Sequence, residues 1–161
     1  MSVFSDAELT YLAKGKLGRL ATIDGAGMPH VVPLGWRYNP ELDAIDIGGR
    51  DFARTRKFRN AQRNPNVALV VDDVLPPWRP RCVLIRGRAE ALAAATGPDG
   101  EPAGPIIRLH PAEVISWGME FAAEYTGNRH RYPPPGRALV SQCAAYAAPI
   151  LTRETRARSG R

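Results

Sequence analysis

The sequence has few of the residues that build metal centres or disulfide frameworks. Among its 161 residues are two cysteines and three histidines. Cys82 and Cys143 stand far apart and match no zinc-ligand spacing, and His30, His110 and His130 are scattered. We therefore expect no metal site, and no disulfide is required.

The chain also lacks any long hydrophobic run. Nowhere do eighteen apolar residues occur together, and residues 1–14 contain no continuous apolar stretch. The sequence therefore predicts neither a membrane span nor a signal peptide, and we expect a cytoplasmic protein.

Motifs for hydrolytic chemistry are missing as well. The sequence shows no nucleophile elbow and no paired carboxylates. This absence argues against a hydrolase more than against a hydride-transfer enzyme, because a redox cofactor carries the reactive group itself.

Positive charge, in contrast, is in surplus. The net charge is +6, and residues 50–63 hold six cations against one carboxylate, with a second basic cluster at 153–161. Such a balance raises the possibility of nucleic-acid binding. No helix-turn-helix, zinc finger or aromatic stacking motif accompanies the clusters, so a nucleic-acid module is the weakest of three hypotheses.

The most informative segment is 53–60, within a predicted helix from Ala53 to Arg63 that Asp51 would cap and Asn64-Pro65 would end. Its opening turn carries the cations Arg54, Arg56 and Lys57 and the hydroxyl of Thr55. The start of a helix attracts anions and repels cations, so this arrangement predicts a bound phosphate. The alternative is a solvated basic face.

The remaining pattern predicts one small barrel of mainly antiparallel strands. A capping box at Ser5 starts a short helix that ends near Gly15. Six strands are expected at 20–23, 28–38, 44–49, 67–71, 82–92 and 106–117, with Gly87 as a bend in the fifth. We expect a mobile loop at 93–105, a solvated basic loop at 128–131 and an unassigned extension at 120–161.

Several segments in this order resemble the pyridoxamine 5′-phosphate oxidase-like split-barrel family, and within it the actinobacterial flavin- and deazaflavin-dependent reductases. They are Gly18–Thr22, Pro29–Trp36, Ala53–Asn60, Asn64–Val70, Gly87–Glu90 and His110–Trp117. The resemblance spans roughly residues 5 to 119. It implies a mainly β fold over residues 1–119: a six-stranded split β-barrel with a crossing helix and a short N-terminal helix. It also implies a homodimer with two cofactor sites at the subunit interface.

The resemblance assigns cofactor-binding roles residue by residue. The backbone along the cofactor ring would be that of Val31, Val32, Pro33, Leu34, Gly35 and Trp36, with Gly48 approaching from the next strand. The phosphate ligands would be Thr55, Arg56 and Lys57, with Arg54 nearby. Trp117 would reach the cofactor edge from the partner subunit. Tyr38 and His30 lie near the ring strand, and we expect both to be structural; no catalytic residue is assigned.

Two departures from the oxidase pattern matter. Cys82 stands where the oxidase has a Gln near the polar edge of the ring, so one hydrogen bond to the cofactor is missing. The basic group 128–131 lies too far along the chain to match the Arg and His that clasp pyridoxal phosphate. We therefore do not expect pyridoxamine phosphate as the substrate.

These inferences lead to an oxidoreductase that moves a hydride between a deazaflavin (coenzyme F-420) or FMN and a small organic acceptor. Arg50, Arg59 and Arg63 could meet the carboxylates of the deazaflavin tail, so we favour that cofactor. The alternative is a protein that binds or stores the same cofactor without turnover.

Overall fold

The computed structural model describes residues 2–96, 102–119 and 128–131. In chain order the elements are α1 (Asp6–Lys14), β1 (Gly18–Ile23), β2 (Pro29–Leu34), β3 (Arg37–Asn39), β4 (Ala44–Gly48), the short 3-10 helix η1 (Phe52–Arg54), α2 (Arg56–Arg63), β5 (Asn66–Leu75), β6 (Arg79–Thr96), β7 (Pro102–Trp117) and β8 (Asn128–Arg131). None of the helices in these ranges is long and apolar enough to cross a membrane.

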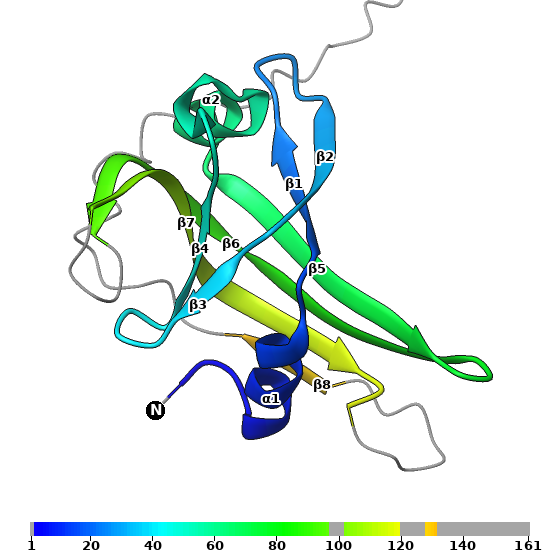
Figure 1. Ribbon diagram of the computed structural model, residues 1–161. Coiled ribbons are helices and arrows are strands. Elements are labelled where there is room, and N and C mark those ends of the chain that lie inside the picture. Colours follow the sequence, from blue (N-terminus) through cyan, green and yellow to red (C-terminus); the bar gives the residue numbers. More distant parts are fainter. Residues whose placement is uncertain (1, 97–101, 120–127, 132–161) are drawn as a thin grey trace, which may run out of the picture.

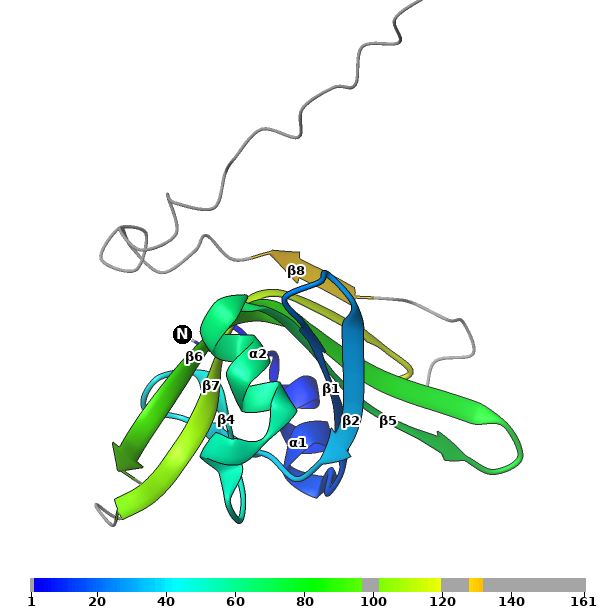
Figure 2. The same cartoon turned by 90° about the horizontal axis from the view of Figure 1, so that it is seen from above.

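The strands form one antiparallel sheet that curls into a barrel, with α1 towards one end and α2 towards the other (Figures 1 and 2). Neighbouring strands follow the order β2-β1-β5-β6-β7-β4-β3, and β8 pairs with β7. This is the mainly β split barrel, with a short N-terminal helix and a crossing helix, that the sequence predicted.

The core lies inside the barrel because alternate residues of each strand point inward. Fully buried aliphatic side chains come from five of the strands: Leu20, Ile45, Ile47, Leu69, Ile85, Ile107, Leu109 and Val114. Leu12 closes the α1 end, and Phe58 of α2 packs edge-on against Phe52, with their ring centroids 5.9 Å apart. Each helix is thus held by the apolar face that it turns towards the strands.

The predicted helix cap at Ser5 and the predicted bend at Gly87 are both confirmed. Ser5 caps α1 by accepting a hydrogen bond from the Glu8 amide at 3.3 Å, while the Glu8 carboxylate accepts from the Ser5 amide at 2.8 Å, and Gly15 ends the helix. Gly87 marks a register shift between β6 and β7. A Cβ at Gly87 would lie 2.0 Å from the His110 carbonyl oxygen, so only glycine allows this close approach.

The prediction of one continuous strand over residues 28–38 is wrong. This segment forms two strands, β2 and β3, on opposite edges of the sheet. The chain leaves β2 at Gly35 and enters β3 at Arg37. Between them the Trp36 ring turns inward against Gly18, whose added Cβ would lie 3.0 Å from that ring. This packing explains the break.

Three further expectations are corrected. Strand β5 continues to Leu75, beyond the predicted end at residue 71. Most of the described part of the expected loop at 93–105 is strand, because Ala95 pairs with Gly104 and Thr96 with Pro102; residues 97–101 lie outside the described ranges. The basic group 128–131 is strand β8 and not a loop, so the sheet has eight strands in place of six.

Candidate functional site

The start of α2 is arranged differently from the prediction. Asp51 makes no capping hydrogen bond and has a left-handed backbone with φ of 50°. Thr55 is the cap: its hydroxyl accepts from the Phe58 amide at 3.4 Å and donates to the Phe52 carbonyl at 2.7 Å. The α-helix therefore begins at Arg56, and Arg54 belongs to the preceding turn η1.

The cations around this cap differ in freedom. The side chains of Arg54 and Arg56 are exposed, whereas Lys57 is half-buried with its ammonium nitrogen 4.9 Å from the centre of the Phe52 ring. Arg59 donates to the Arg54 carbonyl at 3.1 Å. The amides of the first helical turn have no partners within a helix, so they and the guanidinium of Arg56 face the same region of positive potential.

Arg56 also lies near the turn between β1 and β2. Its charge helps to lower the pKa of Asp24, although the larger causes are hydrogen bonds from the Met28 and Ala26 amides. Asp24 accepts those bonds at 2.9 Å each and fixes the turn. The helix start and the beginning of β2 are therefore neighbours, as a site that holds both a phosphate and a ring requires.

Strand β2, which the sequence predicts to lie along the cofactor ring, alternates between exposed and half-buried residues. Val31 and Pro33 are exposed, with Val31 at 59%, while Val32 and Leu34 are half-buried towards the core. Gly35 is exposed and Trp36 packs inward, so Trp36 offers backbone but not its indole to the outside. Gly48 is exposed at the end of β4, in the chain that leads to η1 and α2.

Cys82 and Trp117 form a second group, opposite one another in the pairing of β6 and β7. Cys82 is near the start of β6 and Trp117 is at the end of β7. These two strand ends lie at the end of the barrel away from α2 (Figure 1). Cys82 is buried, and burial raises the pKa of its thiol to about 12, so the thiol stays protonated near neutral pH. Within one chain the predicted site residues are thus brought together as two groups, not one.

Tyr38 and His30, which we expected to be structural, make contacts of different kinds: Tyr38 through its side chain and His30 through its backbone carbonyl. The Tyr38 hydroxyl donates to Asp43 at 2.7 Å and lies 3.4 Å from Ser2. The Thr22 hydroxyl, which accepts from Asn60 of α2 at 3.0 Å, also lies 3.4 Å from the His30 carbonyl oxygen. Asn60 thereby ties α2 to β1.

Sequence reasoning missed two clusters of charge. Arg108 donates to buried Asp46 through two nitrogens, and Glu113 is surrounded by the guanidinium groups of Arg86, Arg129 and Arg131. Each cluster joins residues from different strands, so only the strand register could have revealed it. Among the described residues no three His, Cys, Asp or Glu side chains gather as a metal would need.

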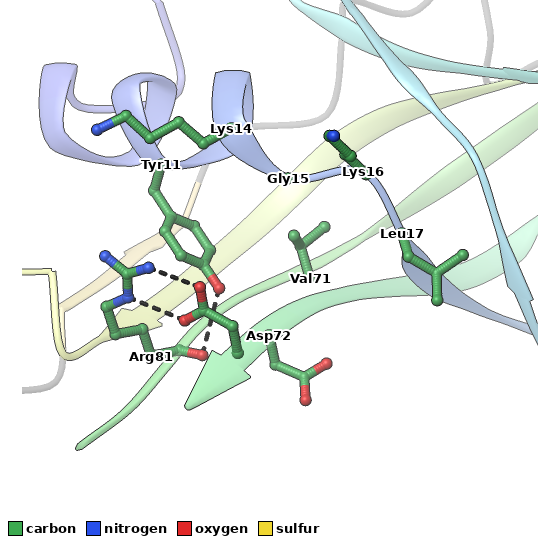
Figure 3. A pocket seen from close by; sticks show the side chains of 9 residues that line it. Tyr11, Lys14, Gly15, Lys16, Leu17, Val71, Asp72 and Arg81 are labelled. Carbon is green, nitrogen blue, oxygen red and sulfur yellow. Dashed lines mark hydrogen bonds and ion pairs between the residues drawn. The ribbon is translucent and has the colours of Figure 1, made fainter. Parts of the chain in front are cut away.

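A cavity of about 280 Å³ lies between α1 and strands β5 and β6 (Figure 3). Arg81 forms a two-nitrogen ion pair with Asp73 there, at 2.6 and 2.9 Å, and its guanidinium stacks over the Tyr11 ring. None of the predicted cofactor-binding residues lines this cavity, which is walled by Tyr11, Lys14, Gly15, Lys16, Leu17, Val71, Asp72, Asp73 and Arg81.

Comparison with known families identifies the fold family. A family model described as pyridoxamine 5′-phosphate oxidase matches residues 4–118. This chain belongs to the pyridoxamine 5′-phosphate oxidase-like split-barrel family. The match ends at residue 118, just after β7, so β8 lies beyond the residues that this oxidoreductase family model matches.

Individual relatives agree with this family. A 5a,11a-dehydrotetracycline/5a,11a-dehydrooxytetracycline reductase of Streptomyces rimosus is 44% identical over 121 residues, which are 73% of this chain and 84% of the relative. A relative so similar over most of the chain makes this split-barrel protein an enzyme.

Solved structures share the architecture at low identity. A putative pyridoxamine 5′-phosphate oxidase from Listeria innocua has a TM-score of 0.52 at 17% identity, covering 67% of this chain and 93% of that one. An FAD-binding protein from Mesorhizobium loti has a TM-score of 0.52 at 20% identity, covering 70% and 93%. These likenesses establish the split-barrel fold.

Proposed function

We propose that this family member is a dimeric reductase that takes a hydride from a reduced deazaflavin, coenzyme F-420, and delivers it to a small organic acceptor, with FMN as the alternative cofactor. The observation that carries the proposal is the start of α2, where exposed guanidinium groups stand beside the amides of the first helical turn, next to strand β2 with its exposed residues.

The residues at this helix start fit a phosphate. Arg56 offers an exposed guanidinium, and the ammonium of Lys57 lies over the Phe52 ring. Charge-assisted hydrogen bonds from such groups are the strong ones. The Thr55 hydroxyl already donates to a backbone carbonyl, so its role here is to fix the helix start rather than to donate to the ligand.

The exposed residues of β2 would support one face of the cofactor ring, with Val31 and Pro33 against the ring and Gly35 permitting close approach of the backbone. Gly48 would approach from β4 and Arg54 from η1. Of the basic residues proposed for the deazaflavin tail, Arg50 has a side chain that is 97% exposed, and its one ion pair among the described residues is a long one, 3.8 Å to Asp51, which the tail carboxylates would replace.

A second copy of the chain would complete the site. Cys82 and Trp117 belong to the ends of β6 and β7 that lie away from the start of α2 in their own chain, so we assign them to the cofactor bound by the partner. The buried thiol would meet the ring as a neutral group. The cofactor supplies the hydride, and the protein's part is to hold the ring, orient it and exclude water from one face.

The name of the reductase relative suggests the chemical class of the acceptor. That protein's name describes reduction of a dehydro compound. We therefore assign to this chain an acceptor with a conjugated double bond, which gains one hydride and one proton and becomes a single bond. The acceptor is the oxidant in this step and the reduced cofactor is the reductant.

Titration of the purified protein with coenzyme F-420 and with FMN, followed by fluorescence, tests the proposal. The Arg56→Ala variant should bind about 10- to 100-fold more weakly, because a charged hydrogen bond contributes about 1.5–3 kcal/mol. Lys57→Ala should show a similar loss. Lys16→Ala removes an exposed cation between α1 and β1 and should bind like the wild type.

The result also separates the alternatives. Unchanged affinity in both Arg56→Ala and Lys57→Ala would refute this site. Cofactor binding without oxidation of the reduced cofactor by a panel of conjugated acceptors would favour storage. Binding to oligonucleotides at moderate salt, without a spectral change on adding either cofactor, would favour a nucleic-acid module.

A further inference from the structure

The strand register lines up six residues in one row on the outer face of the sheet. Residues directly opposite one another in an antiparallel pair share a face. Following the pairing from β2 to β8, this row is Val31, Ala21, Ala68, Arg86, Glu113 and Arg131. The adjacent row, Leu20, Leu69, Ile85 and Val114, is fully buried in the core, so the first row faces outward.

The β6–β8 end of this row is a cluster of guanidinium groups around a single carboxylate, which we call the Glu113 cluster: Glu113, Arg86, Arg129 and Arg131. One oxygen of Glu113 accepts from Arg129 and Arg131 at 2.9 Å each, and the other accepts from Arg86 at 2.9 Å. Among the described residues, no other carboxylate bonds these three arginines.

The Glu113 cluster has more donors than acceptors. Three guanidinium groups carry fifteen N–H donors between them, about five each, whereas one carboxylate has about four acceptor positions. The hydrogen bonds from Arg131 and Arg129 lower the pKa of Glu113 to about 2, so the carboxylate stays charged at any ordinary pH. The three arginines therefore carry two more positive charges than Glu113 neutralises.

The guanidinium groups are open to a ligand. The side chains of Arg86, Arg129 and Arg131 are 59%, 52% and 74% exposed, while that of Glu113 is only 11% exposed. The carboxylate therefore lies beneath the three arginines and holds them, with their unused N–H groups directed outward. Such preorganised, exposed guanidinium groups bind planar oxyanions well.

The outward row beside the Glu113 cluster is apolar on β5, β6 and β7 and carries Arg19 on β1. The next outward row contains Val70, Leu84 and Ile115, all half-buried, and it ends on Arg129 of β8. Towards β2, only Ala68 and Ala21 separate Arg86 from Val31. Three strand spacings span about 14 Å, so a flat ligand of that length could touch both Arg86 and the ring strand.

We propose that the Glu113 cluster recognises the anionic oxygen group, a carboxylate or an enolate, of a flat conjugated acceptor. Arg86, Arg129 and Arg131 bind the anion, and Glu113 positions them. The inference rests on the proposed function in taking the acceptor as the ligand. Arg86 and Glu113 lie within the residues that the family model matches, whereas Arg129 and Arg131 of β8 lie beyond them.

Binding of 1-naphthoate, compared with its uncharged match 1-naphthamide, tests the inference in the full chain without cofactor. Calorimetry should show naphthoate bound at least tenfold more tightly than naphthamide. Arg86→Met and the double variant Arg129→Met/Arg131→Met should each weaken naphthoate about tenfold or more and leave naphthamide unchanged. Lys14→Met, which removes an exposed cation on α1, should leave both affinities unchanged.

NMR of the arginine Nε–H groups locates the ligand. Naphthoate should shift three resonances, which disappear one by one in Arg86→Met, Arg129→Met and Arg131→Met. Equal binding of naphthoate and naphthamide, or naphthoate binding that survives all of these substitutions, would overturn the inference.

A parallel titration with coenzyme F-420 and FMN separates this inference from the proposed function. The cluster variants should bind both cofactors like the wild type. Normal cofactor binding together with no naphthoate binding would sink the acceptor site alone, and loss of coenzyme F-420 affinity in the cluster variants would reassign the arginines to the cofactor tail. No binding of either cofactor to the wild type would instead refute the proposed function.

Discussion

Arg108 of β7 donates two hydrogen bonds to the carboxylate of Asp46 of β4. The Nε atom donates to one oxygen at 2.7 Å, and a terminal nitrogen donates to the other at 2.9 Å. Both side chains are nearly buried, at 12% and 7% exposure, and Asn39 donates a third bond at 3.1 Å. Burial opposes the charge, yet these bonds keep the pKa of Asp46 below its ordinary value.

Asp46→Asn should lower the free energy of unfolding by about 3–5 kcal/mol, because it leaves the Arg108 guanidinium buried without a countercharge. Urea denaturation measures the loss. Asp72→Asn, which breaks the exposed pair of Asp72 with Arg19, is the matched control and should cost about 1 kcal/mol or less. Equal losses in the two variants would contradict the burial argument.

Thr55→Ala should destabilise the protein by about 1 kcal/mol, because it removes the side-chain cap of α2. Thr55→Ser keeps the hydroxyl and should restore most of that stability. Thermal unfolding measures both. If Thr55→Ala lowers cofactor affinity far more than Arg56→Ala does, the hydroxyl contacts the phosphate directly and not only through the cap.

Gly87→Ala should prevent native folding or cost several kcal/mol, because the new Cβ would overlap the His110 carbonyl, which is backbone and cannot move aside cheaply. Gly35→Ala is the control for stability alone, since a Cβ at that position would meet nothing within 4 Å. Circular dichroism and urea denaturation of the two variants test this difference. A soluble, stable Gly87→Ala protein would show that β6 and β7 pair in another register.

Lowering the pH should release β8 before the barrel unfolds. The pKa of Glu113 is about 2 in the folded protein, below the roughly 4.3 of a free Glu, so its ion pairs stabilise fully above pH 4.3 and are lost as the pH falls towards 2. The protection factors of the β8 amides against hydrogen exchange, which compare each rate with that of an unfolded chain at the same pH, should fall across that window. Glu113→Gln should show low protection already at neutral pH, and wild-type β8 protection factors that do not change across the window would contradict this role.

The sequence predicted elements best where one residue type dictates the local backbone. Ser5 and Glu8 cap each other whatever lies around them, and Gly87 is required by contact with the neighbouring strand. Strand ends were predicted less well. The alanines at 93–95 have little intrinsic preference for strand, and their strand conformation comes from pairing with residues beyond 101.

Some residues of the candidate sites could be predicted from the sequence and others could not. The basic helix start was visible because its residues are consecutive in the sequence. The Glu113 cluster was not, because β8 is four residues long and its alignment with Arg86 depends on the register shift beside Gly87. No spacing within the sequence encodes that alignment.

With the cofactor bound at β2 as proposed, the two residues that separate β2 from β3 would couple its binding to the integrity of the whole barrel. Gly35 and Trp36 bridge opposite edges of one sheet, so the exposed strand offered to the ring cannot shift without pulling the Trp36 anchor out of its seat against Gly18. A ligand bound along β2 would therefore hold the two edges of the sheet, β2 and β3, in place. Separation of these edges would release the ligand.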